Sequence, residues 1–344
     1  MIAAGWGPQR VAGCLSLLAL AAVSLALLAP AHAAGFAGVD IPATRAAAAA
    51  SFWTPARMDR AKPVEIAPRW RRGGHPARSS RAGERGPALE VAPSPAAGTV
   101  TSVPASTAAK ASFAAVEDPT APAYRVNGVV FFEDGLFGFG RCSGTSVNAP
   151  NLSVVITAGH CVNGGGFFGH WYPRQWVFVP GYRYGQRPFG VFPAKWLDAT
   201  PLWLREGNEN GDVGIAVVGR NEKGQRLGTA VGGAGFASGL KPQQDFDIHG
   251  YPAAWPFDGE TQRLCTHRSF AGFDPYSILS GEGPLNVSAP CWVTGGASGG
   301  GWTIRGGLLN SVTDYSYTED PETDYGTYFG KEVARLYHRA GRIE

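Results

Sequence analysis

Two short stretches decide the fold of this chain, Thr-Ala-Gly-His-Cys at residues 157–161 and Gly-Ala-Ser-Gly-Gly at residues 296–300. Between them, Asp212 opens an apolar, β-branched run. A single His, Asp or Ser is commonly only a turn, surface or core residue. Here His160, Asp212 and Ser298 follow one another at spacings of 52 and 86 residues, and a cysteine follows the histidine directly. This combination indicates one site built from three distant segments.

The same residues resemble the trypsin-like serine peptidases, whose reactive residues follow one another in the order His, Asp, Ser. The first stretch differs from the commonest form in that family only at Gly159, and the glycines around Ser298 match the family's GxSGG pattern. Cys142 lies nineteen residues before Cys161, near the spacing that the family bridges beside its histidine.

The resemblance covers roughly residues 120–344 and departs from the family pattern beside the serine. Ala297 stands in place of the usual Asp, and Gly301 in place of the usual Pro. In trypsin-like enzymes that Asp pairs with the N-terminus released by activation, and alanine cannot make this ion pair. The bacterial group that includes the glutamyl endopeptidases is similar in lacking the Asp, and looks nearest.

By this resemblance the chain is a serine endopeptidase that forms an acyl-enzyme. Ser298 is expected to attack the scissile carbonyl, His160 to take its proton and pass it to the leaving amine, and Asp212 to hold the imidazole. The backbone N–H groups of Gly296 and Ser298 are expected to form the oxyanion hole.

The substrate pocket is less well defined by the sequence. In the trypsin-type members of the family, a preference for Arg or Lys depends on an Asp at the position where this chain has Trp292. In the glutamyl endopeptidases, a preference for Glu depends on a His at a position that falls near Thr313, and this chain has no His there. Neither preference is predicted. The residues expected to line the pocket are Thr294, Ser311, Thr313 and Asp314.

From about Tyr124 onward, short apolar runs alternate with turn residues at intervals of about ten, which indicates an all-β domain. One stripe of apolar residues in 329–342 indicates a C-terminal α-helix. The resemblance implies that the strands form two six-stranded antiparallel barrels, as in chymotrypsin. Expected strands are 128–132, 142–147, 152–156, 175–179, 212–218, 245–249, 285–293 and 308–315.

Residues 1–33 read as a signal peptide, with an apolar core and a small-x-small cleavage site. The alternative is a membrane anchor, since about nineteen apolar residues could just span a bilayer, but the Ala-rich stretch and the cleavage site favour removal. Residues 34–118 are dominated by Ala, Pro, Arg, Ser and Gly. We expect them to be a largely disordered pro-region or spacer. Residues 119–344 form the expected peptidase domain, and the protein is expected to be a secreted, extracellular zymogen.

Four cysteines remain once Cys14 is removed with the signal, and they allow three disulfide connectivities. The resemblance implies a Cys142–Cys161 bridge, which leaves Cys265 and Cys291 for the second.

The net charge of +3 is uneven, since residues 1–119 carry 12 basic and 7 acidic side chains and residues 120–344 carry 18 and 20. The expected domain therefore lacks the basic character of nucleic-acid-binding proteins. No metal spacing or phosphate-binding loop stands out, so no metal or cofactor is expected. The expected partners are polypeptide substrates, with no nucleic acid, no membrane after signal removal, and a monomeric state.

Two alternatives remain open. The stretch at 296–300 also fits the GxSxG pattern of α/β-hydrolases, in which an esterase would use Ser298 and His338. A catalytically inactive secreted binding module on a peptidase scaffold is the other.

Overall fold

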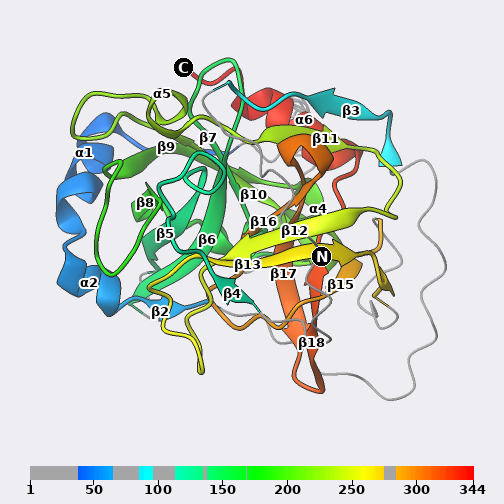
Figure 1. The fold of residues 1–344 in the computed structure, drawn as a ribbon. Helices are drawn as coiled ribbons and strands as arrows, with labels where there is room; N and C mark the ends of the chain where they lie inside the picture. Colours follow the sequence, from blue (N-terminus) through cyan, green and yellow to red (C-terminus); the bar gives the residue numbers. More distant parts are fainter. Residues whose placement is uncertain (1–37, 65–84, 96–112, 135–137, 168, 275–283) are drawn as a thin grey trace, which may run out of the picture. The chain divides into compact units, whose positions relative to one another are not determined.

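The computed structural model describes residues 38–64, 85–95, 113–134, 138–167, 169–274 and 284–344. The expected signal peptide lies outside the described residues. The strands of the described chain form two sheets, and a few short helices lie around them (Figure 1). The expected all-β fold with a C-terminal helix is confirmed.

The first sheet closes into a six-stranded antiparallel barrel. Its strands follow the order β8, β5, β6, β7, β10 and β9, and β9 pairs with β8 to complete the ring. The bounds are β5 (Asn127–Glu133), β6 (Phe139–Val147), β7 (Val154–Thr157), β8 (Arg174–Pro180), β9 (Phe192–Ala199) and β10 (Gly214–Val218). The sequence indicated all of these strands except β9.

Strand β5 has apolar side chains on both of its faces, so the outer face of the barrel has to be buried by another segment. Its apolar residues alternate between two clusters, with Val130 and Phe132 in one and Val129 and Phe131 in the other. Successive side chains of a strand point to opposite faces. Both faces of β5 are therefore apolar, and both have to be buried.

The N-terminal segment supplies that cover. It contains β1 (Val39–Asp40), α1 (Ala43–Phe52), α2 (Pro55–Asp59) and β2 (Lys62–Pro63), and α1 packs against β8 and β9 (Figure 1). Trp53 and Met58 are buried in the same cluster as Val129 and Phe131. The expectation of disorder for 34–118 is therefore wrong for 38–64, because its few large apolar side chains add to a core formed by the barrel.

The second sheet contains β11 (Gly235–Ser238), β12 (Asp245–Gly250), β13 (Arg263–Ser269), β14 (Gly272–Phe273), β15 (Val287–Pro290), β16 (Gly301–Ile304), β17 (Leu308–Tyr317) and β18 (Asp320–Gly326). Two short strands of the expected pro-region join its edges, β3 (Leu89–Val91) on β11 and β4 (Ala114–Ala115) on β13. The main path runs β14, β15, β18, β17, β16, β12, β13 and β4. Among the described residues no backbone pairing closes it as the first is closed.

The C-terminal helix α6 (Lys331–Ala340) is confirmed, and its apolar stripe is buried against the rest of the domain. Tyr337 stacks on Phe236 of β11 with ring centroids 4.1 Å apart. The remaining helices are η1 (Gly159–Cys161), α4 (Pro201–Glu206), η2 (Glu209–Gly211), α5 (Leu227–Val231) and η3 (Arg305–Gly307).

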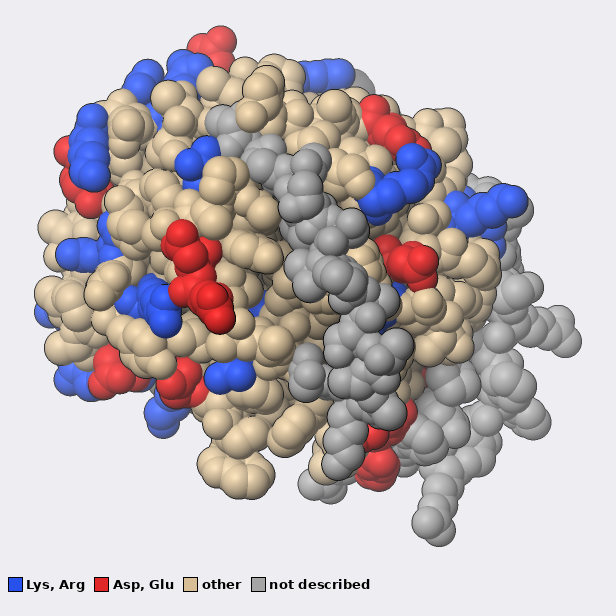
Figure 2. All heavy atoms as spheres, viewed as in Figure 1, with Lys and Arg blue, Asp and Glu red and all other residues tan. Residues whose placement is uncertain are grey.

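Disulfides join Cys142 to Cys161 and Cys265 to Cys291, the pairing that the resemblance implied. Figure 2 shows Lys and Arg scattered over the drawn face with Asp and Glu between them. Within the described part of the chain, no helix is long and apolar enough to cross a membrane.

Candidate active site

His160 lies in the single turn η1, directly after strand β7, and only 4% of its side chain is exposed. The turn has a structural reason, because the disulfide from Cys161 to Cys142 ties it to β6. The ring Nδ1 lies 2.6 Å from Asp212 Oδ2, and the backbone N–H of His160 donates to Asp212 Oδ1 at 2.8 Å. One carboxylate thus fixes both the ring and the backbone of the histidine.

Asp212 ends the turn η2 immediately before β10, and its side chain is fully buried. Burial by itself would raise the pKa of this carboxyl. The attraction of His160 and the hydrogen bonds that Asp212 receives outweigh burial and hold the pKa of Asp212 below its ordinary value. The residue is therefore an anion that faces an imidazole.

Ser298 lies on a tight loop between β15 and β16, and its backbone is fastened to the barrel. Its carbonyl accepts a hydrogen bond from Ser143 N at 2.8 Å, and Ser143 Oγ donates to the carbonyl of Gly296 at 2.8 Å. Gly299 has a φ of 79°, and a Cβ there would lie 2.1 Å from Thr157 Oγ1. The glycines thus allow the serine loop to lie directly against the barrel.

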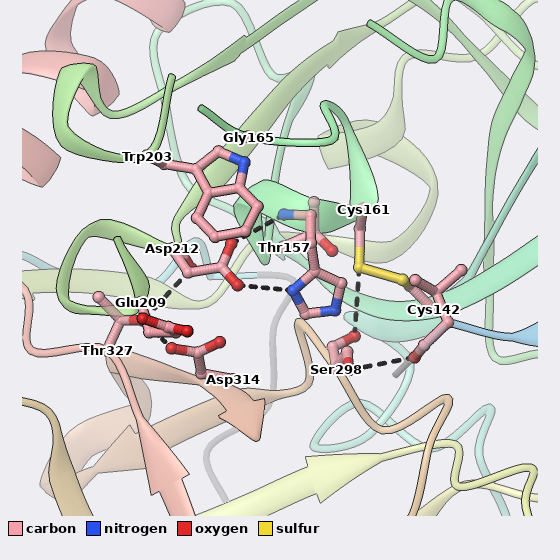
Figure 3. Close-up of polar contacts among 12 residues, drawn as sticks. Cys142, Thr157, Cys161, Gly165, Trp203, Glu209, Asp212, Ser298, Asp314 and Thr327 are labelled. Atoms are coloured by element: carbon pink, nitrogen blue, oxygen red, sulfur yellow. Dashed lines mark hydrogen bonds and ion pairs between the residues drawn. A yellow bond between two sulfur atoms is a disulfide. The ribbon is translucent and has the colours of Figure 1, made fainter. Parts of the chain in front are cut away.

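Together these contacts bring the three predicted residues into one place. Asp212 lies at the imidazole Nδ1, and the carbonyl oxygen of Ser298 lies 3.8 Å from Sγ of Cys161, the residue after His160 (Figure 3). His160 Nε2 is buried, and no described residue forms a hydrogen bond with it. The Nδ1 atom is held by Asp212, so Nε2 is the nitrogen available for proton transfer.

Solved structures similar to this chain include proteases. Protease Anisep from Arthrobacter nicotinovorans is 35% identical with a TM-score of 0.57, and the match covers 64% of this chain and 96% of Anisep. The thermostable serine protease AL20 from an extremophilic microorganism is 33% identical with a TM-score of 0.58, over 64% of this chain and 98% of its own. The chain belongs to the trypsin-like serine peptidases of the chymotrypsin fold.

A Glu endopeptidase structure, 16% identical with a TM-score of 0.50 over 67% of this chain and 97% of its own, shares the fold. No protein-family model and no curated protein matches this chain. About a third of the peptidase chain lies outside each of the three structural matches.

Trp203 explains the departure at Gly159 and was missed at the sequence level. A Cβ on Gly159 would lie 2.6 Å from Asp212 Oδ1 and 2.7 Å from Trp203 Cδ1. The indole is fixed by a 2.9 Å hydrogen bond from its Nε1 to the carbonyl of Asn163, and it covers one side of Asp212 (Figure 3). The glycine at 159 therefore leaves room for both the indole of Trp203 and the fully buried carboxylate of Asp212.

Asp314 lies on the other side of Asp212 and is fully buried (Figure 3). One side-chain atom from each of His160, Asp212 and Asp314 lies within 4.8 Å of the other two. Asn286 Nδ2 donates to Asp314 Oδ2 at 2.9 Å, while Oδ1 accepts no hydrogen bond from any described residue.

The environment of Asp314 favours its neutral form. Burial raises the pKa of Asp314 well above its ordinary value, and repulsion by Asp212 and then Glu209 adds to the effect. Two buried carboxyl groups this close cannot both ionise at low cost. Because Asp212 is the ionised member, a proton on Asp314 can be donated to it.

A shallow hollow beside Ser298 contains three of the four residues expected in the pocket. Thr294, Thr313 and Asp314 line it, together with Val293, Gly295, Tyr315 and Ser316, which the sequence had not indicated. Ser311 is not among the lining residues. Its hydroxyl donates to the carbonyl of Thr327 at 2.9 Å and fills the space beside Gly326.

The α/β-hydrolase alternative is wrong, because the fold is all-β and has no doubly wound parallel sheet in the part of the chain described. His338 is exposed on α6, whereas Ser298 is buried. The structure therefore gives no support for pairing these two residues.

Proposed function

We propose that the protein is a serine endopeptidase that hydrolyses peptide bonds through His160, Asp212 and Ser298. The observation that carries this proposal is the buried His160–Asp212 pair, with its 2.6 Å contact, beside a serine in a glycine-rich loop. A general base oriented by a third group next to a hydroxyl is the arrangement that activates serine as a nucleophile.

The reaction proceeds in two halves. Ser298 Oγ attacks the scissile carbonyl carbon while His160 Nε2 takes the hydroxyl proton, and the N–H groups of Gly296 and Ser298 stabilise the oxyanion. Collapse expels the amine, which takes the proton from His160, and leaves an ester on Ser298. Water, deprotonated by His160, then hydrolyses the ester to a carboxylic acid and restores the serine.

Asp212 stabilises the imidazolium that forms in each half, and Asp314 is a positioning residue that acts through Asp212. Neutral Asp314 donates a hydrogen bond to Asp212 without adding a second negative charge beside the imidazolium. Polypeptides are the proposed substrate class, because the similar solved structures are proteases. The hollow beside Ser298 marks where the side chain next to the scissile bond would lie. Thr294, Thr313 and Asp314 are its proposed contacts.

Secretion and maturation complete the proposal. The apolar sequence of 1–33 supports a cleaved signal, and two disulfides fit an oxidising compartment. We expect the mature N-terminus between about residues 112 and 126, near the change in composition. Phe113 is buried, and its ring and Ala297 both lie against Gly250. In a mature chain that begins at residue 112 or 113, an apolar contact here would take the place of the terminal ion pair.

Labelling the mature enzyme with a fluorophosphonate tests the proposal. One equivalent should attach to Ser298, identified by peptide mapping, and peptide hydrolysis should stop in parallel. Full labelling with unchanged hydrolysis, or labelling at another serine, would refute it. Removal of His338 should leave the labelling rate unchanged.

A further inference from the structure

The carbonyl of Val64, from the N-terminal segment, lies at the reactive serine. Gly296 N–H donates to Val64 O at 3.4 Å, and Ser298 Oγ donates to the same oxygen at 3.4 Å. These are long hydrogen bonds. Gly296 is the residue whose N–H is proposed to stabilise the substrate oxyanion. A backbone carbonyl of the protein itself therefore occupies the position that a substrate carbonyl needs.

The segment reaches this position along the barrel. Strand β2 pairs in parallel with β6, with Lys62 opposite Gly140 and Pro63 opposite Arg141. Val64 N–H donates to the carbonyl of Arg141 at 3.1 Å. The segment thus binds as an extended peptide, the form in which a peptidase takes its substrate.

The direction of the segment is wrong for cleavage. In a productive complex, the residue whose carbonyl meets the oxyanion donors places its side chain in the pocket beside the serine. Val64 instead packs against the barrel cluster, and a Cβ on Gly140 would lie 3.2 Å from Val64 Cγ2. Val64 is not among the residues that line the hollow beside Ser298.

The neighbours of Val64 agree with this reading. Its N-terminal neighbour Pro63 lies opposite Arg141, next to the Cys142–Cys161 bridge that adjoins His160. The leaving amine belongs to the part of a substrate that follows the scissile bond, and it has to lie near His160 to receive its proton. A productive peptide would therefore place its C-terminal residues beside Arg141, where this segment places Pro63. In addition, a hydroxyl that donates to a carbonyl oxygen lies on the lone-pair side of that oxygen and not over the carbon that it would attack.

The segment is held in place from its other end. Trp53 Nε1 donates to the carbonyl of Gln175 at 2.5 Å, and Arg187 Nη1 donates to the carbonyl of Trp53 at 3.0 Å. Met58 is completely buried between this anchor and β2. Because the anchor is part of the same chain, weak contacts at Val64 gain from a high effective concentration.

We propose that Lys62–Val64 is an autoinhibitory strand that lies in the catalytic cleft in reversed orientation and blocks it without being cut. The inference rests on the proposed function, since it assigns a regulator to the same site. Activation then requires the strand to leave β6. The hydrogen bonds from Gly296 and Ser298 to Val64 are long and therefore weak, so they oppose this release only slightly.

The test compares the full chain with Val64→Pro, which removes the N–H that donates to Arg141. Val39→Pro is the matched control, since Val39 is also a half-buried strand valine of the N-terminal segment but pairs with Leu197 of β9. The readout is the second-order rate of labelling by diisopropyl fluorophosphate. We expect Val64→Pro to react at least tenfold faster than the parent and Val39→Pro to react within twofold of it. Equal rates in all three would overturn the proposal.

Hydrogen exchange in a Ser298→Ala background gives a readout that does not depend on catalysis. Val64→Pro, or Val64→Gly if the first variant does not fold, should lose protection at 140–143 and 295–298. Unchanged protection would overturn the strand, whatever the labelling shows. Lost protection without labelling of Ser298 in any variant would leave the strand standing and refute the proposed function. Intact-mass analysis should show no cleavage after Val64, and cleavage there would overturn the reversed orientation.

Discussion

The closed barrel and the second sheet contribute to the site in different ways. His160 and Asp212 both come from turns beside barrel strands, where they contact each other and where Trp203 is fixed. Thr327, which follows β18 of the second sheet, donates to the carbonyl of Asp212 at 3.2 Å. Ser298 comes from the second sheet, and Ser143 of the barrel strand β6 holds its loop. The proposed base is therefore positioned mainly within the barrel, and the proposed nucleophile by contacts between the two sheets.

Removal of the nucleophile should give the largest effect. Ser298→Ala is expected to lower kcat by about 10⁶-fold, by analogy with the loss measured for the subtilisin serine. The His338→Ala variant on α6 is the control and should keep parental kcat. A Ser298→Ala enzyme with parental turnover would mean that the second sheet does not provide the nucleophile.

Asp314 is the one proposed contributor to the base that comes from the second sheet, on β17. Asp314→Ala should lower kcat/KM by about 10- to 100-fold, because a hydrogen bond to a charged group contributes about 1.5–3 kcal/mol. Asp314→Asn should stay within about threefold of the parent, since its amide can donate to Asp212 and its oxygen can accept from Asn286.

The pH profile of kcat/KM distinguishes a hydrogen bond from Asp314 to Asp212 from a purely structural role of Asp314. In Asp314→Ala, Asp212 keeps its charge but loses a donor, so it should hold the imidazolium proton more tightly. The acid limb of kcat/KM should then move to higher pH. Equal damage from Ala and Asn, with an unmoved acid limb, would assign Asp314 to the pocket alone.

Ser143 tests the connection between the two sheets. Its Oγ donates to the carbonyl of Gly296 and accepts from Tyr251 N, both at 2.8 Å. Ser143→Ala should lower kcat about tenfold, since the loop loses its buried hydrogen bond from Ser143 and Tyr251 N–H loses its acceptor, at about 1 kcal/mol each, while the acid limb stays in place. Ser146→Ala removes a similar buried bond to Gly232, on the same strand, and should leave kcat unchanged. A shifted acid limb in Ser143→Ala would show that the base also depends on this contact.

The last prediction concerns stability, not catalysis, and involves His249 of β12 in the second sheet. Burial lowers the pKa of His249 to about 4. Because the unfolded histidine titrates near 6.5, the unfolded state binds the additional proton between about pH 6.5 and pH 4. Stability should therefore fall on acidification through this window, by up to about 1.4 kcal/mol per pH unit from this residue.

Urea unfolding of the parent and His249→Gln across this window measures that contribution. The slope of unfolding free energy against pH should be shallower in the variant, while the exposed His338→Gln should behave like the parent. Identical slopes in all three would mean that His249 does not couple protonation to the folding of the second sheet.

Much of the fold followed from local sequence. Seven of the eight expected strands lie in β5, β6, β7, β8, β10, β12 and β17, because β-branched and aromatic runs broken by turn residues show directly in the chain. The eighth, 285–293, is a shorter strand, β15. Strand β9, Phe-Pro-Ala-Lys-Trp-Leu-Asp-Ala, was missed because its proline and charged residues hide a segment that is mostly buried.

The sequence by itself determined the class of the protein and the residues His160, Asp212 and Ser298, because their short motifs carry the local geometry that such a site requires. The positions of Trp203, Asp314 and Val64 were decided only by the tertiary structure. Each of these residues contacts a residue that is distant in the sequence. A local sequence pattern does not show which apolar face of the barrel is left for another segment to bury. The N-terminal segment is ordered for the same reason, since its apolar side chains have a partner only once the barrel has formed.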